Sequence, residues 1–106
     1  MRMRTLVSTA ALTAATLVPV VAMDGPAHAA PMRKWDRIAH CESGGRWHIN
    51  TGNGYFGGLQ ISKSTWNAYG GRKFARYPHG ATKREQIRVA ERIKNGQGWG
   101  AWPSCA

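Results

Sequence analysis

Two cysteines, Cys41 and Cys105, set the strongest limit on how this 106-residue chain can fold. In an exported protein, an even number of cysteines indicates a disulfide. A bridge that closes so long a loop would stabilise the fold by about 4 kcal/mol by restricting the unfolded chain. The alternatives are two free thiols or a metal site, but no Cys or His pair has the spacing of a zinc site. We therefore expect one disulfide.

The first 29 residues indicate that the chain is exported. A short cationic start precedes the apolar stretch Thr5–Ala22, and helix-breaking residues then lead to Ala27 and Ala29, which fit the small-x-small rule of signal peptidase. We predict a secretory signal over residues 1–29 and one folded domain over residues 30–106. The alternative is a retained membrane anchor, because the apolar run approaches the roughly 18 residues that span a bilayer. The helix breakers and the alanine pair favour cleavage, after which no membrane anchor remains.

The predicted mature domain is small and basic. Its 77 residues are marginal for a hydrophobic core, which is a further reason to expect a disulfide. Removal of Arg2, Arg4 and Asp24 with the signal leaves 13 Lys and Arg against four acids, a net charge of +9. Such a charge draws a secreted protein to anionic polymers, among them wall polymers, teichoic acids and nucleic acid, and does not choose among these polymers.

The first part of the predicted domain combines a helix with a hairpin. Apolar residues at helical spacing predict a helix over Met32–Glu42 that ends at Gly44 and Gly45. Its apolar face comprises Met32, Trp35, Ile38 and Ala39. Two short runs typical of strands, Tyr55–Phe56 and Leu59–Ile61, flank two glycines and predict a small β-hairpin.

Two more helices are expected after the hairpin. Ser62 is a suitable cap for a helix over Lys63–Tyr69, and Thr82 forms a capping box with Glu85. The second of these helices, with Ile87, Val89, Ala90 and Ile93 on its buried face, should stop after Lys94 at Asn95 and Gly96. The fold class is therefore α+β: a small, mostly helical domain with a short β-hairpin and one disulfide.

Four carboxylates remain in the predicted mature domain: Asp36, Glu42, Glu85 and Glu91. Glu85 belongs to the capping box, and Glu91 lies on the charged face of its helix. Asp36 is early in the first helix, where a negative charge suits the helix dipole. Glu42 is different, because it lies at the end of that helix, where the dipole disfavours an anion.

The surroundings of Glu42 favour a catalytic role. It adjoins a cysteine and precedes two glycines, which leave room for a ligand to approach. Near aromatic rings such as Trp47 or Tyr55, its pKa should be raised, as a general acid for a glycosidic oxygen requires. The alternative is a solvated glutamate at a helix end.

The composition of the remaining chain suits a protein that binds sugars. Aromatic rings stack on sugar faces, and the side chains of Asn53, Gln60 and Thr65 can bond hydroxyl and acetamido groups. The aromatic candidates are Trp47, Tyr55, Phe56, Trp66, Tyr69, Trp99 and Trp102. Some tryptophans belong more naturally to the core, and we expect this of Trp35, Trp66 and Trp102.

A set of motifs over Trp35–Cys105 resembles the catalytic domain of bacterial resuscitation-promoting factors, which are lysozyme-like transglycosylases. The motifs are CESGG (Cys41–Gly45), Trp47, NTGNGY (Asn50–Tyr55), GGLQ (Gly57–Gln60), Thr65–Trp66 and QGWGAWPSC (Gln97–Cys105). The basic loop Arg72–His79 departs from the expected pattern.

Together with the predicted export signal, the resemblance leads us to expect a secreted, cell-wall-associated glycosidase, and we expect it to be a monomer that needs neither a cofactor nor a metal. It implies peptidoglycan glycan strands as substrate, a Cys41–Cys105 disulfide and Glu42 as the catalytic residue. The glycan-contacting positions would be Thr65, Gln97 and Trp99, with Gln60 and Tyr55 near the cleft. From the residues themselves, Asn53 and Trp47 are added to the candidates. A peptidoglycan endopeptidase is the partner that the family suggests.

The expected chemistry uses Glu42 alone, although glycosidases usually have two carboxylates. Glu42 would protonate the oxygen between N-acetylmuramic acid and N-acetylglucosamine and then act as base for attack by the muramic 6-hydroxyl or by water. The alternative is a non-catalytic protein that binds the cell wall or acts in signalling. A cationic antimicrobial or nucleic-acid-binding scaffold is disfavoured, because the basic residues are dispersed and no base-reading module is present.

Overall fold

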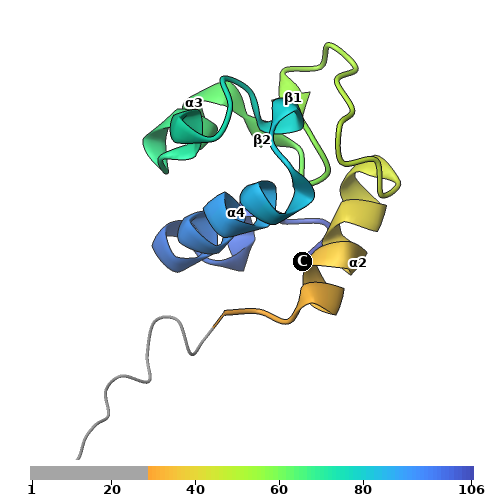
Figure 1. Cartoon of the computed structure of the whole chain (residues 1–106). Helices are drawn as coiled ribbons and strands as arrows, with labels where there is room; N and C mark the ends of the chain where they lie inside the picture. Colours follow the sequence, from red (N-terminus) through yellow and green to blue (C-terminus); the bar gives the residue numbers. More distant parts are fainter. Residues whose placement is uncertain (1–28) are drawn as a thin grey trace, which may run out of the picture.

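A computed structural model describes residues 29–106, which form a small α+β domain made mainly of helices (Figure 1). The predicted fold class is confirmed, whereas all but the last residue of the predicted signal lies outside the described residues. The elements in chain order are helix α2 (Met32–Ser43), strands β1 (Tyr55–Phe56) and β2 (Ile61–Ser62), helix α3 (Lys63–Ala68), 3-10 helices η4 (Gly71–Lys73) and η5 (Pro78–Gly80), helix α4 (Lys83–Gln97) and 3-10 helix η6 (Trp99–Ala101).

The core lies between α2, α4 and the hairpin. Trp35, Ile38 and Ala39 on α2 are completely buried, and the predicted face of α4 is buried against them. Met32 is the exception to the predicted apolar face of α2, because it is 48% exposed. It faces Lys83 and Arg84 in the first turn of α4 and therefore has polar neighbours at this end of the domain.

The β-hairpin is shorter than predicted on its second strand. Tyr55 pairs with Ser62 and Phe56 with Ile61 in an antiparallel register. Leu59 and Gln60 belong to the turn and not to the strand. Gln60 has a left-handed backbone (φ 54°), which interrupts the extended conformation, and Leu59 turns into the core.

Helices α3 and α4 begin as the sequence predicts. The Ser62 hydroxyl accepts the Thr65 N–H at 3.2 Å at the start of α3, and Tyr69 is its C-terminal cap and not its last residue. The capping box at the start of α4 is confirmed: the Glu85 N–H donates to Thr82 Oγ1 at 3.1 Å, and the Thr82 N–H donates to Glu85 Oε1 at 3.0 Å.

Helix α4 extends to Gln97, three residues beyond the predicted end. The N–H of Gly98 still donates to the Lys94 carbonyl at 2.7 Å. Gly96 does not end the helix. Instead, it allows the Tyr69 ring to lie against it, since an added Cβ would come within 2.6 Å of Tyr69 Oη. The glycine is used here for close packing.

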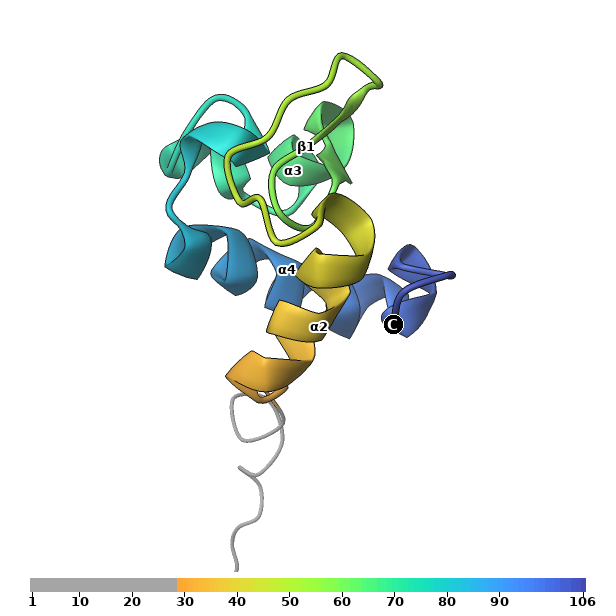
Figure 2. The same cartoon turned by 90° about the vertical axis from the view of Figure 1, so that its right-hand side faces the viewer.

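A disulfide joins Cys41 on α2 to Cys105, with the two Cα atoms 5.7 Å apart. It holds the C-terminal segment close to α2, as Figure 2 shows. The predicted disulfide is therefore confirmed. Trp35, Trp66 and Trp102 are buried, as expected for core tryptophans. Within residues 29–106, no helix is long and apolar enough to cross a membrane.

Candidate active site

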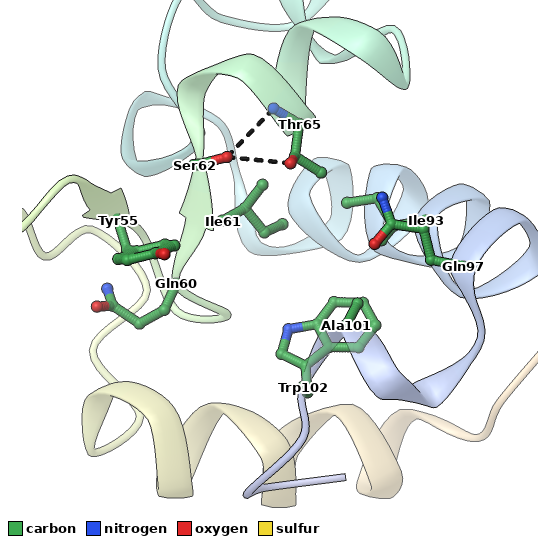
Figure 3. Close-up of a pocket in the computed structure, with 9 residues that line it drawn as sticks. All are labelled: Tyr55, Gln60, Ile61, Ser62, Thr65, Ile93, Gln97, Ala101 and Trp102. Atoms are coloured by element: carbon green, nitrogen blue, oxygen red, sulfur yellow. Dashed lines mark hydrogen bonds between the residues drawn. The ribbon is translucent and has the colours of Figure 1, made fainter.

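Two adjoining hollows form one groove across the domain. One hollow has a volume of about 80 Å³ and lies between the hairpin, the start of α3 and the end of α4 (Figure 3). The other has a volume of about 430 Å³ and contains Glu42. Both are lined by Tyr55, Gln60 and Ala101, so they are continuous, and we call them together the groove.

The end of α2 is held in place by Ser43, the residue after Glu42. The buried Ser43 hydroxyl donates towards two carbonyls, that of Ala39 at 3.0 Å and that of Gly58 at 2.9 Å. The same hydroxyl accepts a hydrogen bond from the Arg46 N–H at 3.1 Å. Gly44 then takes a left-handed conformation (φ 69°), which ends the helix. These contacts fasten the last turn of α2 to the hairpin and so position Glu42 at the wall of the groove.

Glu42 has the electrostatic character that the sequence predicts. Its side chain is partly buried, and this burial raises the pKa of the Glu42 carboxyl above its ordinary value of 4.5, because desolvation penalises the charged form. A carboxyl with a raised pKa retains its proton further towards neutral pH and can donate it to a bound ligand.

The other three side-chain carboxylates are engaged in structural contacts. Asp36 pairs with Lys83 at 2.7 Å, and Glu85 completes the capping box. Glu91 accepts the indole N–H of Trp35 at 2.7 Å. Within the described part of the chain, Glu42 is thus the one side-chain carboxylate with no hydrogen bond or ion pair.

The hairpin side of the groove carries three predicted substrate-binding residues in one hydrogen-bonded group. The Tyr55 N–H donates to Asn53 Oδ1 at 3.0 Å, and Asn53 Nδ2 donates to Gln60 Oε1 at 3.2 Å. Gln60 Nε2 donates to the Gly57 carbonyl at 3.0 Å. The Tyr55 ring is 51% exposed beside Glu42 and can offer a stacking face to a sugar.

Thr65 and Gln97 line the groove beyond the hairpin. Thr65 comes from the first turn of α3, where the Ser62 hydroxyl donates to Thr65 Oγ1 at 3.0 Å. Gln97 is the last residue of α4, and Figure 3 shows both side chains around the same hollow. The three additional residues of α4 that the sequence does not predict therefore position a candidate ligand-binding amide.

Two predicted substrate-binding residues, Trp47 and Trp99, are not among the residues that line the groove. The Trp47 ring packs on Gly58, whose added Cβ would come within 2.4 Å of that ring. Trp99 packs against Trp35 with ring centroids 5.2 Å apart. Both tryptophans contact the core from partly buried positions.

The C-terminal wall of the groove was not predicted, apart from Trp102, which is among the aromatic candidates. This wall consists of Ala101, Trp102, Pro103, Ser104 and Cys105. The disulfide is the signal that could have indicated it, because Cys41 immediately precedes Glu42 and its partner must bring the C-terminal segment beside that carboxyl.

Gln86 is a second residue that sequence reasoning missed. Its side chain is completely buried in α4, where Gln86 Oε1 accepts the Gly58 N–H at 3.0 Å. Gln86 Nε2 donates to the carbonyls of Trp47 at 2.8 Å and Ala81 at 3.0 Å. Gln86 therefore holds the hairpin turn from one side while Ser43 holds it from the other.

The donor groups that could hold a metal are scattered. Within the part of the chain that the structure describes, no group of three or more His, Cys, Asp or Glu residues has a suitable arrangement. The chemical groups at the groove are one carboxyl, several amides and hydroxyls, and an exposed phenol ring. This set is suited to protonating and binding a neutral, oxygen-rich polymer.

The fold and the groove define a small, disulfide-closed, lysozyme-like domain with one unpaired carboxyl in an open cleft. Residues 29–105 match the family described as transglycosylase-like domain, and the chain belongs to this family.

Three relatives named resuscitation-promoting factors agree with this assignment. Rpf1 of Corynebacterium glutamicum is 66% identical over 76% of this chain and 42% of its own length. Rpf of Micrococcus luteus is 54% identical over 81% of this chain and 37% of its own length. RpfA of Mycobacterium tuberculosis is 54% identical over 80% of this chain and 21% of its own length. The predicted resemblance is confirmed, and the matched region spans less than half the length of each of these relatives.

Proposed function

We propose that this chain is a secreted glycosidase that cleaves peptidoglycan at the β-1,4 bond between N-acetylmuramic acid and N-acetylglucosamine. Its role would be cell-wall remodelling during resuscitation from dormancy, in line with the names of its relatives. The observation that carries the proposal is Glu42, which is partly desolvated, has a raised pKa and lies in an open groove. Membership of the transglycosylase-like family supports the same reaction class.

The proposed reaction uses Glu42 first as acid and then as base. Glu42 donates its proton to the bridging oxygen, and the bond from this oxygen to the anomeric carbon of the muramic sugar breaks. The resulting carboxylate then removes the proton from the 6-hydroxyl of the muramic sugar. The oxygen of this 6-hydroxyl attacks the anomeric carbon of the same sugar. The product is a 1,6-anhydro sugar, and Glu42 is again protonated. Attack by water in place of the hydroxyl would give hydrolysis.

The groove supplies groups for binding the glycan near Glu42. The exposed Tyr55 ring can stack on a sugar face, while Asn53 and Gln60 can bond its hydroxyl and acetamido groups. Thr65 and Gln97 can bind the next sugars along the groove. Trp47 and Trp99, which do not line the groove, would bind glycan only where a longer strand extends beyond it.

The proposed location is the cell wall outside the membrane. Residues 1–29 would direct export and be removed, which leaves the domain over residues 30–106 outside the membrane. The basic character of this domain would concentrate it on the anionic wall. A peptidoglycan endopeptidase would be a natural partner, because it cuts the peptide crosslinks that glycan cleavage leaves intact.

The proposal is tested by digesting purified peptidoglycan with the exported protein and identifying the released sugars by mass spectrometry. Wild type should release soluble muropeptides with 1,6-anhydro ends, and Glu42→Gln should release fewer than about one hundredth as many. Glu85→Gln is the matched control, because glutamine preserves the capping box and Glu85 does not line the groove.

Three outcomes of this digestion have distinct meanings. Ordinary reducing ends in place of anhydro ends would show that the reaction is hydrolysis and not transglycosylation. Full activity of Glu42→Gln would contradict the assignment of the catalytic residue. Binding to peptidoglycan with no released sugar from wild type would favour the non-catalytic wall-binding or signalling alternative.

A further inference from the structure

The carboxylate of Glu91 has a set of contacts that the proposed reaction does not use. Its side chain is 19% exposed on α4. Oε1 pairs with Lys94 at 3.0 Å, while Oε2 accepts two hydrogen bonds, from the indole of Trp35 at 2.7 Å and from the backbone nitrogen of Ala30 at 2.9 Å. The contact with Ala30 joins residues 61 positions apart and ties the start of the described chain to α4.

Ala30 is also the residue that follows the predicted cleavage position. We propose that cleavage between Ala29 and Ala30 creates an α-ammonium group that docks on Glu91, so that this carboxylate is the binding site of the mature N-terminus. The inference rests on the proposed export of the chain. It adds a structural role for maturation that peptidoglycan cleavage by Glu42 does not require.

The chemistry of the cleavage converts one kind of contact into another. Signal peptidase breaks the amide bond between the two alanines with one water molecule, leaving a carboxyl on Ala29 and an amine on Ala30 that takes up a proton. Before cleavage, the Ala30 nitrogen donates its single N–H to Glu91 as a neutral amide. After cleavage, the same nitrogen carries a positive charge and three hydrogens, so a hydrogen bond from a neutral amide to a carboxylate becomes an ion pair between two charged groups.

The surroundings suit such a docked terminus. Ala29 is exposed, so the chain before Ala30 leaves the domain at its surface, whereas Ala30 is partly buried and packs against the core. A carboxylate can accept about four hydrogen bonds, so Oε2 can bind the Trp35 indole and the ammonium together. The low exposure of Glu91 also reduces the screening that weakens ion pairs at the surface.

The docking depends on the position of the cleaved bond. One additional residue before Ala30 would move the ammonium by up to about 3.5 Å and leave an ordinary amide at Glu91. The contact also reaches the groove, because Glu91 binds the Trp35 indole and the Trp35 ring packs on Trp102 at 5.2 Å. Trp102 lines the groove.

The experiment begins with the full-length chain, expressed with its signal in an exporting bacterium. Mass spectrometry of the exported protein should give a mature chain that starts at Ala30. Denaturant unfolding is then measured for four exported proteins: wild type, Glu91→Gln, a variant with one glycine inserted between Ala29 and Ala30, and the combination. We expect Glu91→Gln to lower the folding equilibrium constant about fivefold more in the wild-type background than in the inserted background.

Equal effects of Glu91→Gln in the two backgrounds would overturn the inference, as would a mature chain that starts at another residue. If Glu91→Gln does not fold, the variant with the inserted glycine is compared with wild type alone. An unfolding midpoint of this variant equal to that of wild type would overturn the inference. A chain that starts elsewhere but still releases muropeptides through Glu42 would contradict the docking alone. A docked but inactive chain would contradict the proposed function alone.

Discussion

Glu42 is placed where ionisation is unfavourable, and this has a consequence for stability as well as for catalysis. Below the pKa of the unfolded chain, the carboxyl is neutral in both the folded and the unfolded state and contributes no difference. As the pH rises above this value, the folded protein must ionise a partly desolvated group whose pKa is raised. The contribution of Glu42 to stability therefore falls with rising pH.

We therefore predict that Glu42→Gln is at least as stable as wild type near neutral pH. The amide cannot ionise and so avoids the cost of desolvating an anion. The difference in unfolding temperature should be largest at about pH 7 and should vanish at about pH 3, where the glutamate is neutral in both states. Thermal unfolding at these two pH values measures the difference, and a variant that is less stable at pH 7 than at pH 3, relative to wild type, would contradict this account.

Two glutamines on α4 should separate stability from activity. Gln86→Leu leaves the Gly58 N–H and two carbonyls without their partners in the interior, and we expect a loss of about 2–3 kcal/mol of unfolding free energy. Gln97→Leu affects an exposed side chain at the groove, so the unfolding free energy should change by less than about 0.5 kcal/mol.

The same pair is read out by glycan cleavage. Gln97→Leu should raise the substrate concentration needed for half-maximal muropeptide release without a change in the unfolding midpoint. Gln86→Leu should lose activity together with stability, because it loosens the hairpin turn beside Tyr55 and Gln60. The opposite assignment, a destabilised Gln97→Leu with normal cleavage, would contradict the roles given to these two residues.

At the scale of elements, the junction between α2 and the hairpin depends on Gly58. Its N–H donates to Gln86, its carbonyl accepts from Ser43, and its Cα faces the ring of Trp47. These contacts hold the end of α2 against the hairpin turn, and the alignment of Glu42 with Tyr55 and Gln60 depends on that junction.

Gly58→Ala should therefore destabilise the domain by about 1–3 kcal/mol, since the new Cβ would lie 2.4 Å from the Trp47 ring and force it to move. Gly100→Ala is the control, because an added Cβ there meets no atom within 4 Å. Chemical denaturation of the two variants gives the comparison. Equal unfolding midpoints for the two would show that the ring adjusts without cost.

The elements that could be predicted from the sequence are those with a local cause. The capping box of Thr82 and Glu85, the cap at Ser62 and the helical spacing of Trp35, Ile38 and Ala39 all act over a few residues, and each has its predicted effect. The misplaced boundaries have causes that are distant in sequence. Helix α4 continues past Gly96, which packs against Tyr69 and does not end the helix, and no local pattern indicates this packing.

The candidate site follows the same distinction. Glu42 could be singled out because the helix dipole disfavours an anion at its position, whereas the long-range contacts of Glu91 with Trp35 and Ala30 could not be predicted from its place on the charged face of a helix. Five of the seven predicted substrate-binding residues line the groove, while Trp47 and Trp99 pack elsewhere because buried neighbours compete for their rings. Their binding roles remain predictions for all seven. Gln86 was not predicted, because a polar side chain inside a helical pattern gives no sign of partners 28 and 39 residues away.

At the scale of the whole molecule, the disulfide links stability to the shape of the groove. It closes a loop of 64 residues and holds Pro103, Ser104 and Cys105 beside Glu42. A chain of this size has a small core, so the restriction that the bridge places on the unfolded state is a large share of its stability.

Replacement of both cysteines by serine should lower the unfolding free energy by about 4 kcal/mol and reduce glycan cleavage together with it. Denaturant unfolding of oxidised wild type, reduced wild type and the double variant provides the measurement. If the reduced protein kept the unfolding midpoint and the activity of the oxidised protein, the bridge would be unnecessary to both the fold and the groove.

If Glu42 donates the proton that cleaves the glycan, the initial rate of muropeptide release must depend on the pH, and measuring this dependence tests the role of Glu42 most directly. The rate should fall as the pH rises through a midpoint above 4.5, the ordinary value for this side chain, because the acid form is lost. The ionisation of the Glu42 carboxyl can be monitored through its carbon NMR signal in the same samples. A rate that stays constant while this carboxyl ionises would show that Glu42 is not the proton donor.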